Sequence, residues 1–498
     1  MKSIVFQSAL QIGESIHSGA TSAVEVAEAV LNHIQTHNDS VNAIVAMNEH
    51  DIREAAKQAD REVQAGHIRS PLHGVPITIK DSYAVEGLTT TIGYEPLKHY
   101  IPNFDATIVQ RLKEAGAIIV GKTNVPALLM DLQTNNTIFG RTNNPWDVTR
   151  TCGGSSGGGA AAVAAGFSYL DIGSDIGGSL RIPAHYCGVY SLRATEHAIS
   201  SFGHMPGLDT NAKYRSSRHL ASYGPLTRSI DDLIAAYAII AGYDGKDIRV
   251  PRVNVKDTKI EIKQEVRQKA KALNIAWMDA LPGVPVSQET KDSIHTWIHK
   301  LKAKGVKTTK LSQFPVDTEQ VWETWGKMIS AELYSETPAL ARFLKHILTK
   351  KKQKQVPTLR GTFPLTFKNY MVAWTKREDL ITAFDTFIAD YDMLILPVSS
   401  TVAFPHMKMD KIIGGQPMYT KDIYIDEQPV NYWQATTAHA NLFNVLQNPV
   451  LTMPIQLTKA GLPLGIQCVG RKWSDMELLQ KAKELKQLVN FELPQCPI

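Results

Sequence analysis

Three short segments of the chain carry serine or lysine in unusual backbone. Lys80 ends the apolar run GVPITIK, Ser155 lies in CGGSSGGG, and Ser179 lies in SDIGGSLRIP. A lysine at the end of a buried strand loses the solvation of its charge, so its pKa falls. A neutral lysine amine can act as a general base toward a serine, as in the Ser–Lys variants of the serine triad. The segments therefore predict nucleophilic serine chemistry.

Strand and helix patterns alternate around these segments. Apolar strand-like runs end at Lys80, precede Ser179, and recur at 392–399 and 464–470, with an amphipathic helix predicted at 287–304. This alternation predicts an α/β fold in which helices cover both faces of a sheet.

We expect a single domain over residues 1–498, because no repeat or low-complexity linker divides the chain. The catalytic segments lie at about 70–200, and the less regular region at about 200–440 is expected to shape the substrate pocket. In that region VWETWGKMISAELY (321–334) holds two tryptophans three residues apart. They form either the buried aromatic face of a helix or a wall of the pocket.

Composition excludes several classes of protein. The net charge of +5 is weak for 498 residues and gives no nucleic-acid footprint. No apolar stretch approaches the roughly 20 residues that cross a bilayer, and the first residues lack the apolar region of a signal peptide. The four cysteines are scattered, which predicts a reduced, cytoplasmic protein.

One motif suggests nucleotide chemistry. GAIIVGKT at 116–123 matches the phosphate-loop pattern, which would make the protein an ATPase. Its variable residues have a β-strand composition, however, and Pro126 follows too soon for a helix to start at Lys122. We therefore predict a strand here. Two histidine pairs one helical turn apart lack a third ligand, so no metal site is predicted.

The three catalytic segments resemble the amidase signature hydrolases. GGSSGG is followed at the family's separation by SDIGGSLRIPAHYCGV, and a lysine lies upstream in GVPITIKD. FGRTNNPWD, YGPLTRSIDDL and GLPLGIQCVGR also fit, so the resemblance covers nearly the whole chain and is weakest at about 245–390. It implies a large mixed β-sheet covered by helices on both faces.

The resemblance also implies the roles of the catalytic residues. Ser179 is the nucleophile, and Ser155, after a cis peptide bond from Gly154, relays a proton between Ser179 and Lys80. Lys80 is the base that starts the relay and the acid that returns the proton to the leaving amine.

The glycines before Ser179 are suited to forming an oxyanion hole. Acyl transfer needs N–H groups that converge on the developing anion, and glycine, without a Cβ, permits this. The expected donors are the backbone N–H groups of Ile176, Gly177, Gly178 and Ser179. Asp175 and Arg181 flank the turn, and the family implies that they support it by hydrogen bonding.

The substrate pocket is predicted from the segment after KTNVP, which the family places along the acyl side. Leu129, Met130 and Asp131 fall in this segment. Its apolar residues favour a mainly apolar acyl group, and Asp131 is a candidate contact for a substrate amino group.

The chain departs from the family after the nucleophile segment. Where the family usually reads Gly-Leu-Lys-Pro-Thr, residues 191–195 read Ser-Leu-Arg-Ala-Thr, followed by Glu196-His197-Ala198. This puts the shape of a neighbouring pocket wall in doubt. It also weighs against the transfer-RNA amidotransferase subunit, which normally keeps that stretch.

We therefore predict a serine amidohydrolase that cleaves a carbon–nitrogen bond in a small-molecule amide without metal or cofactor, possible as a homodimer. Two alternatives stay open beside the ATPase. One is an amidotransferase subunit that supplies ammonia with a partner chain, and the other is a binding protein on an inactive amidase fold. The intact Lys80, Ser155 and Ser179 argue against the second.

Overall fold

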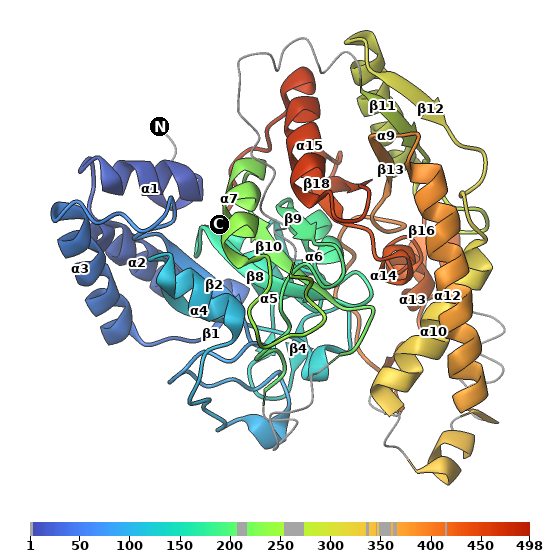
Figure 1. The fold of residues 1–498 in the computed structure, drawn as a ribbon, viewed down its shortest axis with the longest axis horizontal. Helices are drawn as coiled ribbons and strands as arrows, with labels where there is room; N and C mark the ends of the chain where they lie inside the picture. Colours follow the sequence, from blue (N-terminus) through green and yellow to red (C-terminus); the bar gives the residue numbers. More distant parts are fainter. Residues whose placement is uncertain are drawn as a thin grey trace.

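The computed structural model describes residues 3–206, 217–252, 273–334, 338–344, 346–347, 360–361, 366–413 and 416–498. Its centre is one mixed sheet (Figure 1). In sheet order the strands are β1 (Ile44–Ala46), β3 (Ile118–Thr123), β2 (Pro76–Lys80), β8 (Leu170–Asp175), β10 (Ser222–Thr227), β9 (Tyr190–Arg193), β18 (Val450–Leu457), β19 (Pro463–Val469), β13 (Met393–Pro397), β11 (Asn274–Trp277) and β12 (Lys307–Lys310).

The sheet lies between helices, as predicted. α5 and α6 contact each other and the sheet, whereas α7, α9 and α15 form a separate set of contacts with it. The helices are α1 (Ala9–His17), α2 (Ala23–Val41), α3 (Glu49–Gln64), α4 (Thr107–Glu114), α5 (Gly157–Ala164), α6 (Arg181–Cys187), α7 (Ile230–Ile240), α9 (Gln288–Ala303), α10 (Thr318–Tyr334), α12 (Phe367–Ile388), α13 (Tyr432–Thr437), α14 (Leu442–Leu446) and α15 (Asp475–Val489).

Short elements connect this framework. Three single 3₁₀ turns are Ile4–Phe6, Glu95–Leu97 and Ala127–Leu129. Small hairpins pair β4 (Asn135–Asn136) with β5 (Gly140–Arg141), β6 (Asn143–Asn144) with β7 (Asp147–Thr151), β14 (Lys411–Ile413) with β15 (Gln416–Met418), and β16 (Ile423–Ile425) with β17 (Gln428–Val430).

Local sequence explains where helices begin. Ser22 and Glu25 form a capping box at the start of α2, in which each side chain accepts from the other residue's backbone N–H. α5 begins directly after the glycine-rich segment, and its glycines and alanines permit close packing. A Cβ on Gly159 would lie 2.1 Å from a carboxylate oxygen of Asp171 on β8.

The predicted strand at GAIIVGKT is confirmed as β3. Lys122 is buried, and its Nζ donates to the Tyr83 carbonyl and the Thr90 hydroxyl, both at 2.7 Å. It also lies 3.3 Å from a carboxylate oxygen of Asp81. Because the amine has protein partners inside the core, the phosphate-loop alternative is wrong.

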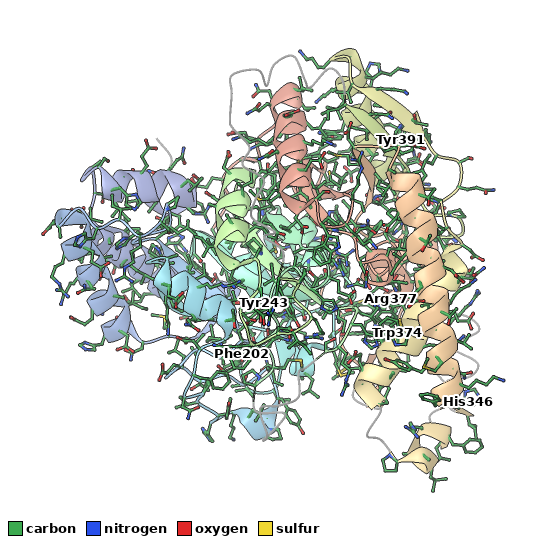
Figure 2. All side chains as sticks on the ribbon, viewed as in Figure 1. Phe202, Tyr243, His346, Trp374, Arg377 and Tyr391 are labelled. Carbon is green, nitrogen blue, oxygen red and sulfur yellow. The ribbon has the colours of Figure 1, made fainter. Side chains whose placement is uncertain are left out.

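Helices α10 and α12 pack on each other and on α14, beside the C-terminal part of the sheet. Figure 1 shows them together at one side of the molecule, opposite the N-terminal helices α1–α3. Trp374 and Arg377 lie on α12 (Figure 2). Among the described residues, no helix is long and apolar enough to span a membrane.

Candidate active site

The sheet brings the predicted catalytic segments together. β2 and β8 run parallel and pair directly, so Lys80 at the end of β2 and Asp175 at the end of β8 lie at the same edge. The turn that carries Ser179 follows β8, and Ser155 lies two residues before the start of α5. Side chains at the carboxyl ends of adjacent parallel strands are well placed to form a site.

Lys80 is the centre of a buried hydroxyl cluster. Its Nζ lies 2.9 Å from Ser155 Oγ and 2.8 Å from Ser156 Oγ. It also contacts the hydroxyl of Ser174 at 3.1 Å and its carbonyl at 3.3 Å. The contact with Ser155 is within proton-transfer distance.

Burial controls the ionisation of this lysine. It lowers the pKa of Lys80 to about 7, although Asp171 and Asp175 oppose the shift by favouring the charged amine. Burial also raises the pKa of Asp171 to about 7, against hydrogen bonds from Thr78 and Thr123 that favour its ionised form. A lysine with this pKa is neutral in a large fraction of molecules at neutral pH, as a general base requires.

Ser155 and Ser179 line the same cavity. The peptide bond between Gly154 and Ser155 is cis, as the resemblance implied. Gly154 is tightly packed, since a Cβ there would lie 2.8 Å from the Asp131 carbonyl oxygen. Ser156 is held by its N–H, which donates to the Ser179 carbonyl at 3.1 Å. A backbone hydrogen bond therefore connects the segment of Ser155 with the segment of Ser179.

The oxyanion turn differs from the prediction at one position. Gly178 N–H donates to Asp175 Oδ1 at 2.9 Å, so it is not free to meet an oxyanion in this conformation. The N–H groups of Ile176, Gly177 and Ser179 meet no acceptor among the described residues. Gly178 is nevertheless required by the turn, because its φ is 113° and a Cβ would approach Ile182 Cδ1 to 2.6 Å.

Asp175 and Arg181 support this turn by direct contact. Arg181 donates to both carboxylate oxygens of Asp175, at 2.8 and 3.0 Å. Burial would raise the pKa of Asp175, but the Arg181 charge and hydrogen bonds hold it well below its usual range. Leu180 N–H and the Asn444 amide also donate to this carboxylate. The acceptor that orients the turn is thus held in its ionised form.

The cavity beside Ser179 has a volume of about 150 Å³ and is lined mainly by apolar side chains. The two tryptophans of α10 divide the two expected roles, a buried aromatic face and a wall of the pocket. Trp322 is buried and donates to the Ala438 carbonyl, whereas Trp325 lines the cavity and donates to the Ile176 carbonyl at 3.1 Å. Helix α10 is therefore attached to the oxyanion turn and forms a wall of the cavity.

Leu129, Met130 and Asp131 line this cavity. Asp131 Oδ1 accepts from the Tyr432 hydroxyl at 2.7 Å, and Oδ2 accepts from the Tyr419 hydroxyl. Burial raises the pKa of Asp131 to about 6 against these hydrogen bonds. The carboxyl group thus already binds two tyrosines, which connects the pocket segment to the chain around 419–432.

Several residues of the site were not singled out from the sequence. Ser156 and Ser174 lie inside the quoted motifs, so their positions next to Ser155 and Asp175 were the available signal. Asp171 lies within the strand that leads to the nucleophile turn, where a charged residue in a buried strand is itself unusual.

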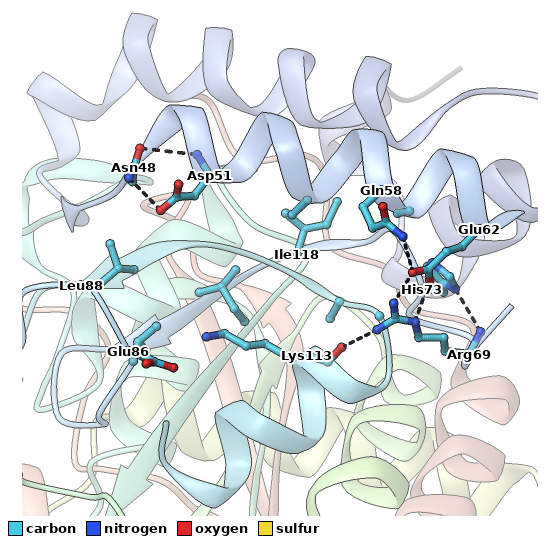
Figure 3. Close-up of a pocket in the computed structure, with 16 residues that line it drawn as sticks. Asn48, Asp51, Gln58, Glu62, Arg69, His73, Glu86, Leu88, Lys113 and Ile118 are labelled. Atoms are coloured by element: carbon cyan, nitrogen blue, oxygen red, sulfur yellow. Dashed lines mark hydrogen bonds and ion pairs between the residues drawn. The ribbon is translucent and has the colours of Figure 1, made fainter. Parts of the chain in front are cut away.

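A second cavity, of about 260 Å³, lies between α3, α4 and the start of β3 (Figure 3). Several of its charged groups are paired with protein. Arg69 donates to Glu62 at 2.7 Å, His73 lies 3.3 Å from the same carboxylate, and Lys113 pairs with Asp105. In the described part of the chain, no three His, Cys, Asp or Glu side chains converge as a metal site.

Comparisons with known proteins agree with this geometry. The family model named Amidase matches residues 25–479. A glutamyl-tRNA(Gln) amidotransferase subunit from Methanococcoides burtonii is 31% identical over 488 residues, covering 93% of each chain. A solved bacterial aryl acylamidase of the amidase signature family superposes with a TM-score of 0.77 at 23% identity, covering 98% of this chain and 97% of that one. The chain belongs to the amidase signature family.

Proposed function

We propose that this protein is a serine amidohydrolase that cleaves the carbon–nitrogen bond of a small-molecule amide. The observation that carries the proposal is the contact of Lys80 Nζ with Ser155 Oγ at 2.9 Å, beside a cavity that Ser155 and Ser179 both line. A buried lysine with a pKa of about 7 supplies the base that this serine pair needs.

In the proposed reaction, Ser179 Oγ attacks the amide carbon while its proton passes to Ser155, whose own proton passes to neutral Lys80. The oxyanion is met by the N–H groups of Ile176, Gly177 and Ser179. When the carbon–nitrogen bond breaks, the proton returns through the same serine to the leaving amine. Water then attacks the acyl-enzyme, again with Lys80 as base, and releases the acid and Ser179. No cofactor takes part in these steps.

The cavity favours a substrate with a mainly apolar body. Leu129 and Met130 contribute to its wall, and no lysine or arginine side chain is among the described residues that line it. The similarity to amidotransferase subunits supports a second candidate function, in which the chain supplies ammonia together with a partner chain.

The first experiment is a mass-spectrometric screen of primary amides, N-alkyl amides and esters. We expect product from the wild type and a loss of at least about 10³-fold in kcat for Ser179→Ala. Ser40→Ala, at an exposed position, is the matched control. Equal turnover by the wild type and Ser179→Ala would exclude Ser179 as the nucleophile. Activity that appears only with a co-purified partner chain would favour the amidotransferase function.

The oligomeric state and the location remain predictions. The four cysteines are buried and unpaired, which supports a reduced, cytoplasmic protein. A homodimer would be recognised by light scattering of the purified chain.

A further inference from the structure

One face of α10 forms a wall of the active-site cavity. Trp325, Ile329, Glu332 and Leu333 line the cavity and follow the spacing of a single helical face. Three of them are apolar and Glu332 is acidic. Placing a carboxylate in a mainly apolar cavity costs free energy unless the carboxylate has partners. The contacts of Glu332 therefore indicate whether it is available to bind a ligand.

One oxygen of Glu332 is fully engaged. Oε1 accepts from the backbone N–H groups of Arg218 at 3.0 Å and His219 at 3.2 Å, and it contacts Nδ1 of the His219 ring. The side chain is only 4% exposed. No described residue donates to Oε2, so this oxygen retains its capacity to accept hydrogen bonds.

The carboxylate is also held in position. The other ring nitrogen of His219, Nε2, lies 2.9 Å from the Tyr370 hydroxyl. The His219 ring stacks on Trp374 of α12 with centroids 5.1 Å apart and an interplanar angle of 26°. Glu332 is thus supported by a side chain that is itself fixed by a second helix, which is typical of a preorganised binding group.

Two other charged side chains of this region, Asp131 and Arg249, already bind protein groups. Both oxygens of Asp131 accept from tyrosine hydroxyls. Arg249 donates to Asp247 and to the Ser201 hydroxyl. Among the described acidic residues that line the cavity, Glu332 is therefore the one whose carboxylate has an oxygen, Oε2, available to accept a hydrogen bond from a ligand.

The position of Glu332 on α10 gives the separation between its carboxylate and the oxyanion turn. Trp325 contacts the oxyanion turn through the Ile176 carbonyl. Glu332 follows Trp325 by nearly two helical turns, which at about 1.5 Å per residue places it roughly 10 Å further along the cavity wall. An apolar chain can span this separation between the reacting amide and Glu332.

We propose that Glu332 is a specificity residue that binds an ammonium group at the far end of the amide substrate. Oε2 accepts a charge-assisted hydrogen bond from the ammonium, and the apolar side chains enclose the chain between the two ends. The substrate class is then an ω-amino amide with an apolar spacer. This inference deepens the proposed function, but binding at Glu332 does not require turnover.

The test measures binding to Ser179→Ala by calorimetry, so that hydrolysis is not involved. The ligands are ω-amino alkanamides of increasing length, each compared with the alkanamide in which a methyl group replaces the ammonium. A second set places the same chain on the nitrogen of acetamide. We expect the ammonium ligands to bind more tightly at one intermediate length in at least one set. Adding Glu332→Gln should weaken these ligands by about 10- to 100-fold and leave the methyl ligands unchanged.

Two control variants show whether the ammonium preference belongs to Glu332. Glu323→Gln changes an acid on the same helix that is half exposed and paired with Lys327, and it should have no effect. Asp131→Asn tests the other carboxylate of the cavity and should leave the ammonium preference in place. Equal binding of both ligand types, or a preference lost in Asp131→Asn but kept in Glu332→Gln, would overturn the assignment to Glu332. Neither result would bear on Ser179, whose role the turnover assay tests separately.

Discussion

Two buried ionisable groups determine the state of the candidate catalytic residues. Lys80 and Asp171 both have a pKa of about 7, because burial disfavours the charged form of each. The negative charge of Asp171 acts against burial at Lys80 and raises the pKa of the amine. Asp171 therefore limits how far burial lowers the pKa of Lys80.

This arrangement predicts the pH dependence of the reaction. In the proposed mechanism neutral Lys80 is the active form, so kcat/KM should rise as pH increases through about 7 and fall below it. Asp171→Asn removes the charge that raises the pKa of Lys80, so the acid limb should move to lower pH. Profiles of kcat/KM for the wild type, Asp171→Asn and the exposed control Asp39→Asn check this prediction. An acid limb that stays in place in Asp171→Asn would contradict it.

At the scale of elements, the segment that departs from the family contributes to a buried charge network. Arg193 ends β9, and Glu196 follows it. Glu196 pairs with Arg377 of α12 and accepts from Leu220 N–H at 3.1 Å. Burial would raise the pKa of Glu196, but Arg377 and His197 lower it. The departure thus connects α12 to the strands behind the oxyanion turn.

Breaking this connection should destabilise the protein. Arg377→Met leaves the Glu196 charge buried without its main partner, which should reduce the free energy of unfolding by about 3–5 kcal/mol at neutral pH. In the wild type the pKa of Glu196 is lowered, so its stabilisation exists above the normal carboxyl range and is lost as pH falls. The difference between variant and wild type should therefore shrink in acid.

Urea denaturation at neutral and mildly acidic pH measures this difference. Lys376→Met, at the adjacent partly exposed position, is the control and should cost little. A difference that is independent of pH would mean that Arg377 acts through its contacts with the Asn444 and Val445 carbonyls instead of through charge.

At the scale of the whole molecule, one sheet contains strands from both ends of the chain. β2 and β8 come from the first part, and β18, β19 and β13 from the last part (Figure 1). Arg181, just after the nucleophile turn, also bonds to Asn444 and Gln467. We propose on this basis that the chain folds as one domain.

A single domain should unfold in one transition. Seven of the eight tryptophans follow residue 273, so fluorescence reports mainly on the later part of the chain, while far-UV circular dichroism reports on all of it. We expect the two thermal curves to coincide. Two separated midpoints, with fluorescence changing apart from circular dichroism, would indicate two independently stable parts.

The sequence by itself determined the local elements and the candidate catalytic groups. Apolar runs predicted β2, β3 and β8, because a buried strand needs only its own residues to be apolar. The Lys80, Ser155 and Ser179 segments could be recognised from residue types and spacing. The backbone of these three segments is shaped by nearby glycines and by the ends of strands, and both features can be read from adjacent residues.

The tertiary structure decided which groups have partners. Asp131 meets Tyr432 across 301 residues of chain, and Glu332 meets His219 across more than 100, so no local pattern could reveal either contact. Gly178 N–H could be excluded as a donor only when its bond to Asp175 was seen. Hydrogen bonds of buried polar groups depend on what the fold brings within about 3 Å, and that proximity is a property of packing, not of sequence spacing.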